Sequence, residues 1–387
     1  MVNKGKALPV KLSLFYIFQY AALASFTPYL TYYFQQKGLS YTQIGILLAI
    51  SSLVGVFAQP AWGSITDKYL NNRVSLMVSM LIAALAMVPF MLADEFYVIA
   101  LFLILLLCFQ SPVMPLGDAY TYEIIEQHSE MQYGKIRLMG SIGYAVTAFL
   151  IGNVANKVGI QSAFIIFSFL MVLGAVTIAS VNVESKTVRK RSESRGIIKL
   201  LKNREFILFL AMTTIVNVSF GINSNYVTIL VQETGGNVAN LGVLWFVLAI
   251  SELPVLYFAN RLMKKLGDMN VILIGVGLFI LRYFFSSLCS SYIAVIGVQL
   301  LQSVTFPLFL IGVLNYLNRT APPNMKTSAM TLYSASGGIG IFIGNAVGGV
   351  LLESISIFSL YRIITLVSVI GLLLALGLKK INLKSYE

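Results

Sequence analysis

Apolar stretches of membrane-crossing length recur along the whole chain, separated by short polar segments. About 20 apolar residues cross a bilayer as an α-helix, and twelve stretches meet or approach that length. Several exceed it, which indicates tilted helices. The pattern predicts an all-α integral membrane protein with twelve transmembrane helices, roughly at residues 12–34, 43–65, 74–93, 97–121, 138–156, 160–181, 206–231, 238–259, 269–289, 292–317, 328–352 and 359–378.

One long polar stretch, Val183–Arg204, interrupts this pattern and carries eight basic residues. Six apolar stretches precede it and six follow it. A run of like charge is usually a solvated connector. We therefore expect an N-terminal six-helix half over 1–182, a basic cytoplasmic linker over 183–204 and a C-terminal six-helix half over 205–387.

The distribution of basic residues predicts the orientation of the chain. With both termini placed in the cytoplasm, only Lys37, Lys157 and Arg362 of the 27 basic residues face outward, and Arg282 lies within a stretch, which leaves 23 on the cytoplasmic side. Cytoplasmic loops of membrane proteins carry an excess of Lys and Arg. We expect a multi-pass protein of the cell membrane with both termini in the cytoplasm.

The composition also places the chain in a bilayer. Apolar residues make up 58% of the 387 residues, charged residues only 11%, and the mean hydropathy is +0.84. Soluble proteins carry roughly 25% charged residues. The net charge of +12 does not indicate a nucleic-acid partner, because the basic residues gather at the ends of apolar stretches, where they set topology.

The residues that catalysis or metal binding requires do not occur in suitable combinations. Cys108 and Cys289 lie in separate apolar stretches and His128 is the only histidine, so we expect neither a disulfide framework nor a metal site. We find no nucleophile–base set and no nucleotide-binding loop. We expect no enzyme activity and no cofactor, with a proton gradient as the driving force.

Four charged residues lie inside or at the edge of apolar stretches, in two pairs on consecutive stretches: Asp118 with Arg137, and Glu252 with Arg282. Charges in the membrane are costly unless they pair or line a cavity, and they usually mark function. We expect them to form a central site. The alternatives are a fixed structural ion pair for Glu252 and Arg282, and a snorkelling anchor for Arg137.

Glycine and uncharged polar residues add two further expectations. Gly340, Gly344 and Gly348 recur every four residues, which predicts a close-packing helix face. Other polar side chains within the stretches either line a cavity or hydrogen-bond a neighbouring helix, and these are Gln19, Tyr20, Asn217, Asn223, Asn225, Gln299 and Gln302.

The loop GSITDKYLNNR, Gly63–Arg73, resembles the signature between the second and third spans of the major facilitator superfamily. The resemblance implies two six-helix halves that rock around a site near the bilayer midplane, and a cytoplasmic gate formed by Gly63, Asp67, Lys68 and Arg73. Gly63 would allow two helices to approach closely. The loop lacks the glycine expected between its basic residues.

A second segment, PLGDAY…YGKIRLMGSIGYA, is similar to the oligosaccharide:proton symporter branch (lactose permease relatives) and to 3-phenylpropionate permease-like chains. The resemblance implies that Asp118, Arg137 and Tyr144 bind substrate, with Tyr144 stacking on a ring. It also implies that Glu252 and Arg282, together with Asp118, couple proton movement to transport.

The chain departs from the lactose permease pattern at the proton relay. Gln302 and Thr305 stand where that pattern has a histidine and a glutamate, and Gly337 stands where it has a lysine. Asn223 lies near the position of missing acids in span seven, and we expect Asn223 and Gln302 to contact substrate. Glu252, a lone acid two residues before Pro254, is then the best proton carrier, because proline loosens the helix locally.

These observations predict a secondary active transporter, with the lipid bilayer, protons and a small-molecule substrate as partners, acting as a monomer. The main hypothesis is proton-coupled symport of a sugar, nucleoside or aromatic acid. The alternative is a proton-driven multidrug or metabolite efflux antiporter. Exporters of the superfamily commonly carry a Gly-Pro motif in span five, and GSIGYAVTAFLIGN contains no proline. A sensor or scaffold without turnover is a third hypothesis.

Overall fold

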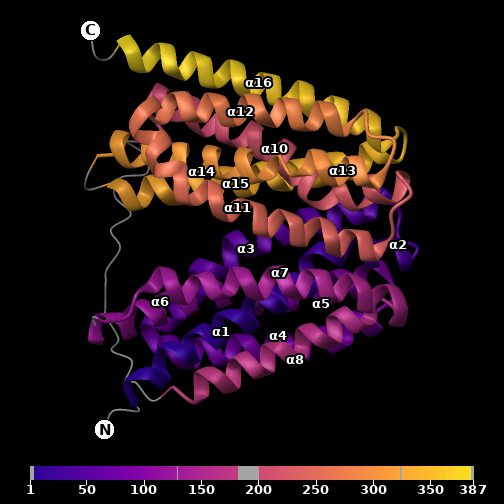
Figure 1. Cartoon of the computed structure of the whole chain (residues 1–387), viewed down its shortest axis with the longest axis vertical. Coiled ribbons are helices and arrows are strands. Elements are labelled where there is room, and N and C mark those ends of the chain that lie inside the picture. Colours follow the sequence, from indigo (N-terminus) through magenta and orange to yellow (C-terminus); the bar gives the residue numbers. More distant parts are fainter. Residues whose placement is uncertain (1–3, 129, 182–199, 323–324, 385–387) are drawn as a thin grey trace. The chain divides into compact units, whose positions relative to one another are not determined.

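The computed structural model describes residues 4–128, 130–181, 200–322 and 325–384. The regular structure in these ranges is helical and contains no strand (Figure 1), which confirms the all-α prediction. Most of the predicted linker lies outside the described residues. The helices are α1 (Lys4–Phe26), η1 (Thr27–Tyr29), α2 (Leu30–Gln36), α3 (Tyr41–Tyr69), α4 (Asn72–Leu92), α5 (Phe96–Gln110), α6 (Val113–Gln127), α7 (Tyr133–Val158), α8 (Gln161–Ala179), α10 (Arg204–Glu233), α11 (Val238–Leu266), α12 (Asp268–Ser286), α13 (Tyr292–Gln299), α14 (Gln302–Thr320), α15 (Lys326–Leu352) and α16 (Ile357–Lys384).

The helices account for the twelve predicted membrane spans. In the described ranges, eleven helical segments are long and apolar enough to cross a membrane, and the remaining predicted span begins with the shorter apolar segment Val238–Glu252 of α11. Most of the observed segments extend beyond the predicted stretches by a few residues, whereas Gln161–Ala179 is shorter than the predicted 160–181 and Asp268–Ser286 ends before the predicted 289. The fourth span, for example, covers Phe96–Gln127 rather than 97–121, because polar residues continue the helix after the apolar stretch has ended.

Three spans consist of two consecutive helices rather than one. Pro28 lies in the 3-10 helix between α1 and α2, and Ser111 and Pro112 separate α5 from α6. Proline has no N–H to donate and its ring clashes with the preceding turn, so both breaks have a local cause. The third break separates α13 from α14 at Leu300 and Leu301, and neither residue explains it.

The chain forms two compact units. Unit 1 contains Met1–Leu39, Leu53–Lys190 and Asn237–Phe246, and unit 2 contains Ser40–Ser52, Arg191–Gly236 and Val247–Glu387. Helices α3 and α11 therefore each contribute residues to both units. The two sequence halves, 1–182 and 205–387, stay a prediction.

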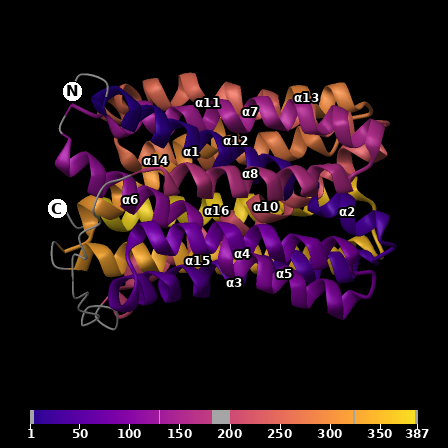
Figure 2. The ribbon, with the colours of Figure 1, turned by 90° about the horizontal axis from the view of Figure 1, so that it is seen from below.

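In unit 1, α1 packs along α7 and α8, while α4 packs along α5 and α8 (Figure 2). The interior is aromatic where α1, α4 and α8 meet. The ring centroid of Phe26 lies 6.2 Å from that of Phe90, 5.8 Å from that of Phe164 and 5.2 Å from that of Phe167. The first two of these contacts are edge-on and the third is tilted. Buried aromatic side chains contribute large apolar areas, and here they hold α1 beside its neighbours.

In unit 2, α10 packs along α15 and α16, and α12 packs along α14 and α16. Gly340, Gly344 and Gly348 of α15 form the predicted packing face. A Cβ atom at Gly340 would collide with the carbonyl oxygen of Thr214, and one at Gly344 with that of Val218. Glycine lets α15 approach the backbone of α10 this closely, because it has no side chain.

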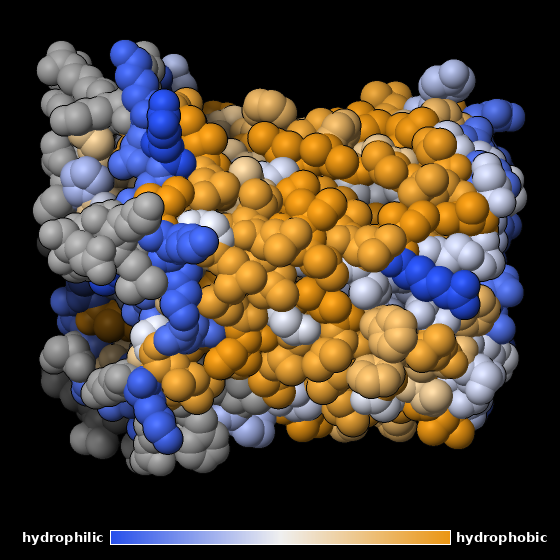
Figure 3. All heavy atoms as spheres, turned by 90° about the horizontal axis from the view of Figure 1, so that it is seen from above, coloured by the Kyte–Doolittle hydropathy of each residue, from blue (hydrophilic) through white to orange (hydrophobic). Residues whose placement is uncertain are grey.

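Large apolar side chains remain exposed along the helices. Phe57, Leu85 and Leu366 have 71%, 70% and 66% of their surface exposed. Figure 3 shows hydrophobic residues over the middle of one face of the molecule and hydrophilic residues toward two opposite edges of that face. Continuous apolar surface of this kind is a liability in water, and it matches the lipid environment expected of a membrane-spanning protein.

Candidate functional site

The four charged residues singled out from the sequence fall into two clusters, one in each unit. Asp118 on α6 and Arg137 on α7 belong to unit 1, whereas Glu252 on α11 and Arg282 on α12 belong to unit 2. Each unit therefore contains one of the predicted combinations of an acid and an arginine.

Glycines bring α1 against α6 and α7 and thereby build the first cluster. A Cβ at Gly117, next to Asp118, would meet the ring of Phe15 at 2.6 Å, and one at Gly140 would meet the ring of Tyr20 at 2.7 Å. Because these two positions lack side chains, aromatic rings of α1 fill the space beside the charged residues. Side chains of α1 therefore pack beside the acid and the arginine.

Asp118 and Arg137 form the predicted pair, at a loose distance. The Nε atom of Arg137 lies 3.9 Å from Oδ1 of Asp118. The side chain of Arg137 is 26% exposed and that of Asp118 is 30% exposed, so neither is sealed inside the unit. Partly exposed pairs gain little net stability from their attraction. The pair is therefore better suited to binding than to holding the helices together.

Two tyrosines of α1 complete this cluster. The hydroxyl of Tyr16 donates to Oδ1 of Asp118 at 2.7 Å and lies 3.3 Å from Oγ1 of Thr121. The guanidinium carbon of Arg137 lies 4.3 Å from the ring centroid of Tyr20 and 5.7 Å from that of Tyr16. We call Tyr16, Tyr20, Asp118 and Arg137 the acid–arginine cluster.

The sequence identified Tyr20 only as a polar residue within a span, and it did not single out Tyr16. Their spacing of four residues places both side chains on one face of α1, and this was the available signal. The ring over Arg137 belongs to Tyr20. Tyr144 lies seven residues after Arg137 on α7 and is half-buried, and its stacking on a substrate ring stays a prediction.

In unit 2, Glu252 and Arg282 do not form the direct ion pair that was the structural alternative for them, within the described residues. Gln302 connects them instead. Its Nε2 donates to Oε1 of Glu252 at 3.4 Å, and its Oε1 accepts from Nη2 of Arg282 at 2.5 Å. An amide carries both a donor and an acceptor, so Gln302 can hold a carboxylate at one end and a guanidinium at the other.

Arg282 is fully buried and held by amides. Its Nε donates to Oε1 of Gln299 at 2.9 Å, and its Nη2 contacts the same oxygen. Its Nη1 has no hydrogen-bond partner among the described residues. A buried cation needs compensating groups, and here amide oxygens supply most of them.

The contacts continue from Gln299 to two more helices. Nε2 of Gln299 donates to Oδ1 of Asn223 on α10 at 3.0 Å, and the hydroxyl of Tyr361 on α16 donates to the same oxygen at 3.1 Å. We call this set the glutamine network, and its members are Glu252, Gln302, Arg282, Gln299, Asn223 and Tyr361. It joins α10, α11, α12, α13, α14 and α16.

Asn223 and Gln302, which the sequence predicts to contact substrate, are both members of the glutamine network. Asn223 is 1% exposed and its oxygen already accepts two hydrogen bonds. Gln302 is 8% exposed and bonded at both ends. In this conformation both act within the protein, and their contact with a substrate stays a prediction.

The predicted loop Gly63–Arg73 is mostly helical, because it comprises the end of α3, Leu70 and Asn71, and the start of α4, and it contacts other helices of unit 1. Arg73 donates to the carbonyl of Ala179 at the end of α8, and Asn72 donates to Oε2 of Glu123 on α6 at 3.1 Å. Gly63 does not make the close helix contact expected of it, since a Cβ there would meet no heavy atom within 4 Å. Asp67 and Lys68 are exposed, and the gate role of this loop stays a prediction.

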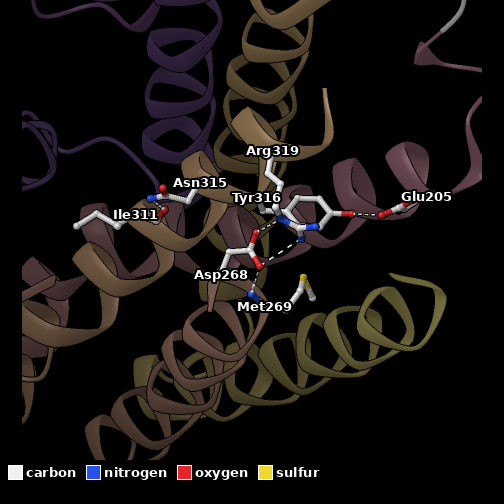
Figure 4. A network of polar contacts seen from close by, with 7 residues as sticks. All are labelled: Glu205, Asp268, Met269, Ile311, Asn315, Tyr316 and Arg319. Atoms are coloured by element: carbon white, nitrogen blue, oxygen red, sulfur yellow. Dashed lines mark hydrogen bonds and ion pairs between the residues drawn. The ribbon is translucent and has the colours of Figure 1, made fainter. Parts of the chain in front are cut away.

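Unit 2 carries a charged contact that the sequence did not indicate (Figure 4). Nε of Arg319 donates to Oδ2 of Asp268 at 2.8 Å, and the hydroxyl of Tyr316 donates to Oε1 of Glu205 at 2.6 Å. Asp268 follows Gly267, whose φ of 76° permits the sharp turn from α11 to α12. Together these bonds tie the ends of α10, α12 and α14.

No group of three or more metal-ligating side chains occurs in the part of the chain that the structure describes. His128 instead lies 3.8 Å from the carboxylate of Glu130.

The sequence is similar to a protein-family model and to known membrane transporters. A family model described as "MFS_1 like family" matches residues 10–363. The chain is 28% identical to a maltose permease from Geobacillus stearothermophilus over 373 residues, which is 95% of this chain and 93% of the relative. It is also 28% identical to the multidrug resistance protein MdtG from Escherichia coli O6:K15:H31 (strain 536 / UPEC) over 261 residues, or 64% and 63% of the two chains.

Solved structures support the fold. The crystal structure of the nucleoside transporter NupG superimposes with a TM-score of 0.86 and covers 96% of this chain and 99% of its own, and a mutant form of NupG superimposes with a TM-score of 0.89. The sequence identities are 16% and 15%, so this likeness concerns the fold alone.

Proposed function

This chain belongs to the MFS_1 like family, and from that premise we propose that it is a proton-coupled symporter of a small, neutral, hydroxylated solute, working by alternating access. Its membership makes it a membrane transporter of the major facilitator type rather than an enzyme. The proposal concerns the kind of solute, the coupling ion and the direction of transport.

The observation that carries the proposal is the loose, partly exposed pair of Asp118 and Arg137. A carboxylate accepts hydrogen bonds and a guanidinium donates them, so the two together complement hydroxyl groups, which do both. The pair has no net charge. An anionic solute bound at Arg137 would lie close to Asp118, and two like charges 4 Å apart repel by about 1 to 4 kcal/mol, depending on the surroundings.

Glu252 supports proton coupling. Among the described residues of the C-terminal half it is the only acid well inside a span, since Glu205, Glu233, Asp268 and Glu353 all lie at helix ends. A carboxyl that passes between wet and dry surroundings gains and loses a proton readily. Gln302 is hydrogen-bonded to both Glu252 and the buried Arg282. Protonation of Glu252 would therefore change the hydrogen bonds of Arg282 and, through them, the packing of unit 2.

The names of similar proteins are consistent with this solute class. The relative from Geobacillus stearothermophilus is a maltose permease, and NupG is a nucleoside transporter. Maltose and nucleosides are neutral and carry several hydroxyl groups. The aromatic-acid variant of the sequence hypothesis is disfavoured by the charge argument above.

The similarity to MdtG over 64% of the chain favours a second candidate, a proton-driven efflux antiporter. The two candidates differ in the direction of proton movement relative to solute. A symporter carries both inward together, whereas an antiporter exchanges them.

Purified protein in liposomes that contain a pH-sensitive dye would test the proposal. We would add maltose, uridine and 3-phenylpropionate separately, and use Glu252→Gln as the control. We expect interior acidification with maltose or uridine, absent from the control variant. Acidification with 3-phenylpropionate alone would contradict the neutral solute class. Gradient-driven export of a lipophilic cation, without any symport, would favour the antiporter.

A further inference from the structure

We propose that Tyr16 and Tyr20 are positioning residues of the solute site, which hold Asp118 and Arg137 in the orientation that receives two neighbouring hydroxyl groups. This inference rests on the proposed function and deepens it. It assigns a positioning role to two residues of α1, a helix for which the sequence indicated only that Gln19 and Tyr20 line a cavity or hydrogen-bond a neighbouring helix.

Tyr16 constrains the acid through one of its two oxygens. The hydroxyl of Tyr16 donates to Oδ1 of Asp118 at 2.7 Å, and the ring is buried beside Phe15. A phenol in a packed position cannot follow the carboxylate, so this bond restrains the position of Oδ1. Nε of Arg137 approaches the same Oδ1 atom, and Tyr133 of α7 also interacts with Asp118. A carboxylate has about four acceptor sites on its two oxygens, so the acid keeps the capacity to accept from a solute hydroxyl.

Tyr20 constrains the arginine through its ring face. The guanidinium carbon lies 4.3 Å from the ring centroid, within the range of a cation–π contact. The ring is itself fixed, because it fills the space left by Gly140 on α7 and its hydroxyl lies 3.6 Å from the sulfur of Met114. This cation–π contact positions the guanidinium beside the ring without occupying its hydrogen-bond donors.

The terminal nitrogens of Arg137 donate no hydrogen bond within the described part of the chain. A planar fork of donors therefore stands beside the acceptor oxygens of Asp118. One solute hydroxyl can donate to the acid while its neighbour accepts from the arginine. Holding both groups in place before binding reduces the entropic cost of ordering them when the solute binds. This is the role that we propose for Tyr16 and Tyr20.

The first arm of the test needs no solute. We would measure the melting temperature of the purified protein with Tyr16→Phe, Asp118→Ala and both changes together, because an asparagine at position 118 would still accept from Tyr16 through its amide oxygen. Contacting residues show non-additive effects in such a cycle. We expect the double variant to melt no lower than the worse of the two single variants. Additive losses would overturn the Tyr16–Asp118 contact.

The second arm measures transport of maltose and uridine. We expect Tyr16→Phe to raise the KM about tenfold, the effect of losing one hydrogen bond to a charged group, with the maximal rate changed much less. Tyr20→Leu should raise the KM several-fold by removing the stacking face, and Tyr20→Phe should raise it less because the ring remains.

Tyr120→Phe is the matched control. Tyr120 lies on α6, is fully buried, and its hydroxyl has no hydrogen-bond partner among the described residues. We expect its KM to match that of the wild-type protein. A coupled melting cycle with an unchanged KM in Tyr16→Phe and Tyr20→Leu would overturn the positioning role. If the wild-type protein transported neither probe, the proposed solute class would fail, and the cycle would still decide whether Tyr16 holds Asp118.

Discussion

Gln302 donates its amide hydrogen to the carboxylate of Glu252 at 3.4 Å, and its oxygen accepts from the buried guanidinium of Arg282. A residue that cannot titrate thus stands between the one acid of this network and its one arginine. Glu252 and Arg282 are therefore linked by two hydrogen bonds of the same amide group.

We predict that Gln302→Leu removes the hydrogen-bonded link between Glu252 and Arg282. Leucine has a similar volume but no donor or acceptor, so protonation of Glu252 would no longer change the contacts of Arg282. Uphill accumulation of solute in liposomes should fall by about tenfold or more, the scale of one hydrogen bond to a charged group. Solute exchange without a gradient should persist.

Ser303→Ala is the control on the same helix, because among the described residues the hydroxyl of Ser303 bonds only to the carbonyl of Leu300 in the preceding turn. Its accumulation should be normal. Full uphill transport by Gln302→Leu would show that Glu252 acts without Gln302.

Arg137→Lys should impair solute binding although it keeps the charge. A lysine ammonium is a point charge that offers neither the planar fork nor the flat face that lies over Tyr20. We expect the KM to rise by about tenfold or more, as measured by initial rates of solute uptake. Lys135→Arg, an exposed change two residues earlier on α7, should leave the KM unchanged. Wild-type affinity in Arg137→Lys would support the alternative of a snorkelling anchor.

Gly344→Ala should destabilise unit 2. The added Cβ would collide with the carbonyl oxygen of Val218, so α15 must move away from α10. Overpacking of this kind costs about 1–3 kcal/mol, which should lower the melting temperature in detergent. Gly277→Ala is the matched substitution on α12, where a Cβ would meet no atom within 4 Å. Equal melting temperatures for the two variants would contradict the close packing of α15 on α10.

Glu353 should make stability depend on pH in the acid range. Its carboxylate accepts from the backbone N–H of Thr42 at 2.8 Å, and this bond lowers the pKa of Glu353 below its usual value. A lowered pKa in the folded state gives stabilisation that is present above the unfolded pKa, about 4.3 for glutamate, and is lost as the pH falls through the folded pKa.

The comparison that isolates this effect is between the wild-type protein and Glu353→Gln. The wild-type protein should melt at the higher temperature near pH 7, and the difference should shrink below about pH 4.3. A difference that stays constant from about pH 7 to about pH 3 would mean that the charge of Glu353 contributes nothing.

The sequence alone predicted the membrane-spanning segments and the charged positions within them, because both depend on whether a segment is surrounded by lipid or by water. Apolar length decides which segments can cross a bilayer, so the twelve spans and the all-α class followed without any tertiary information. The glycine spacing of Gly340, Gly344 and Gly348 likewise predicted a packing face, because a period of four residues places them on one side of a helix. The cost of charge in lipid marked Asp118, Arg137, Glu252 and Arg282.

Only the tertiary structure decided which groups these charges contact. Tyr16 and Tyr20 lie about 100 residues before Asp118 in the chain, and no local pattern ties them to it. Gln302 stands between Glu252 and Arg282 for the same reason, since three helices must pack before its amide has two partners. Hydrogen bonds are short and directional, whereas hydropathy is a property of each segment alone, and so the sequence predicted the spans and the charged positions but not the partners of those charges.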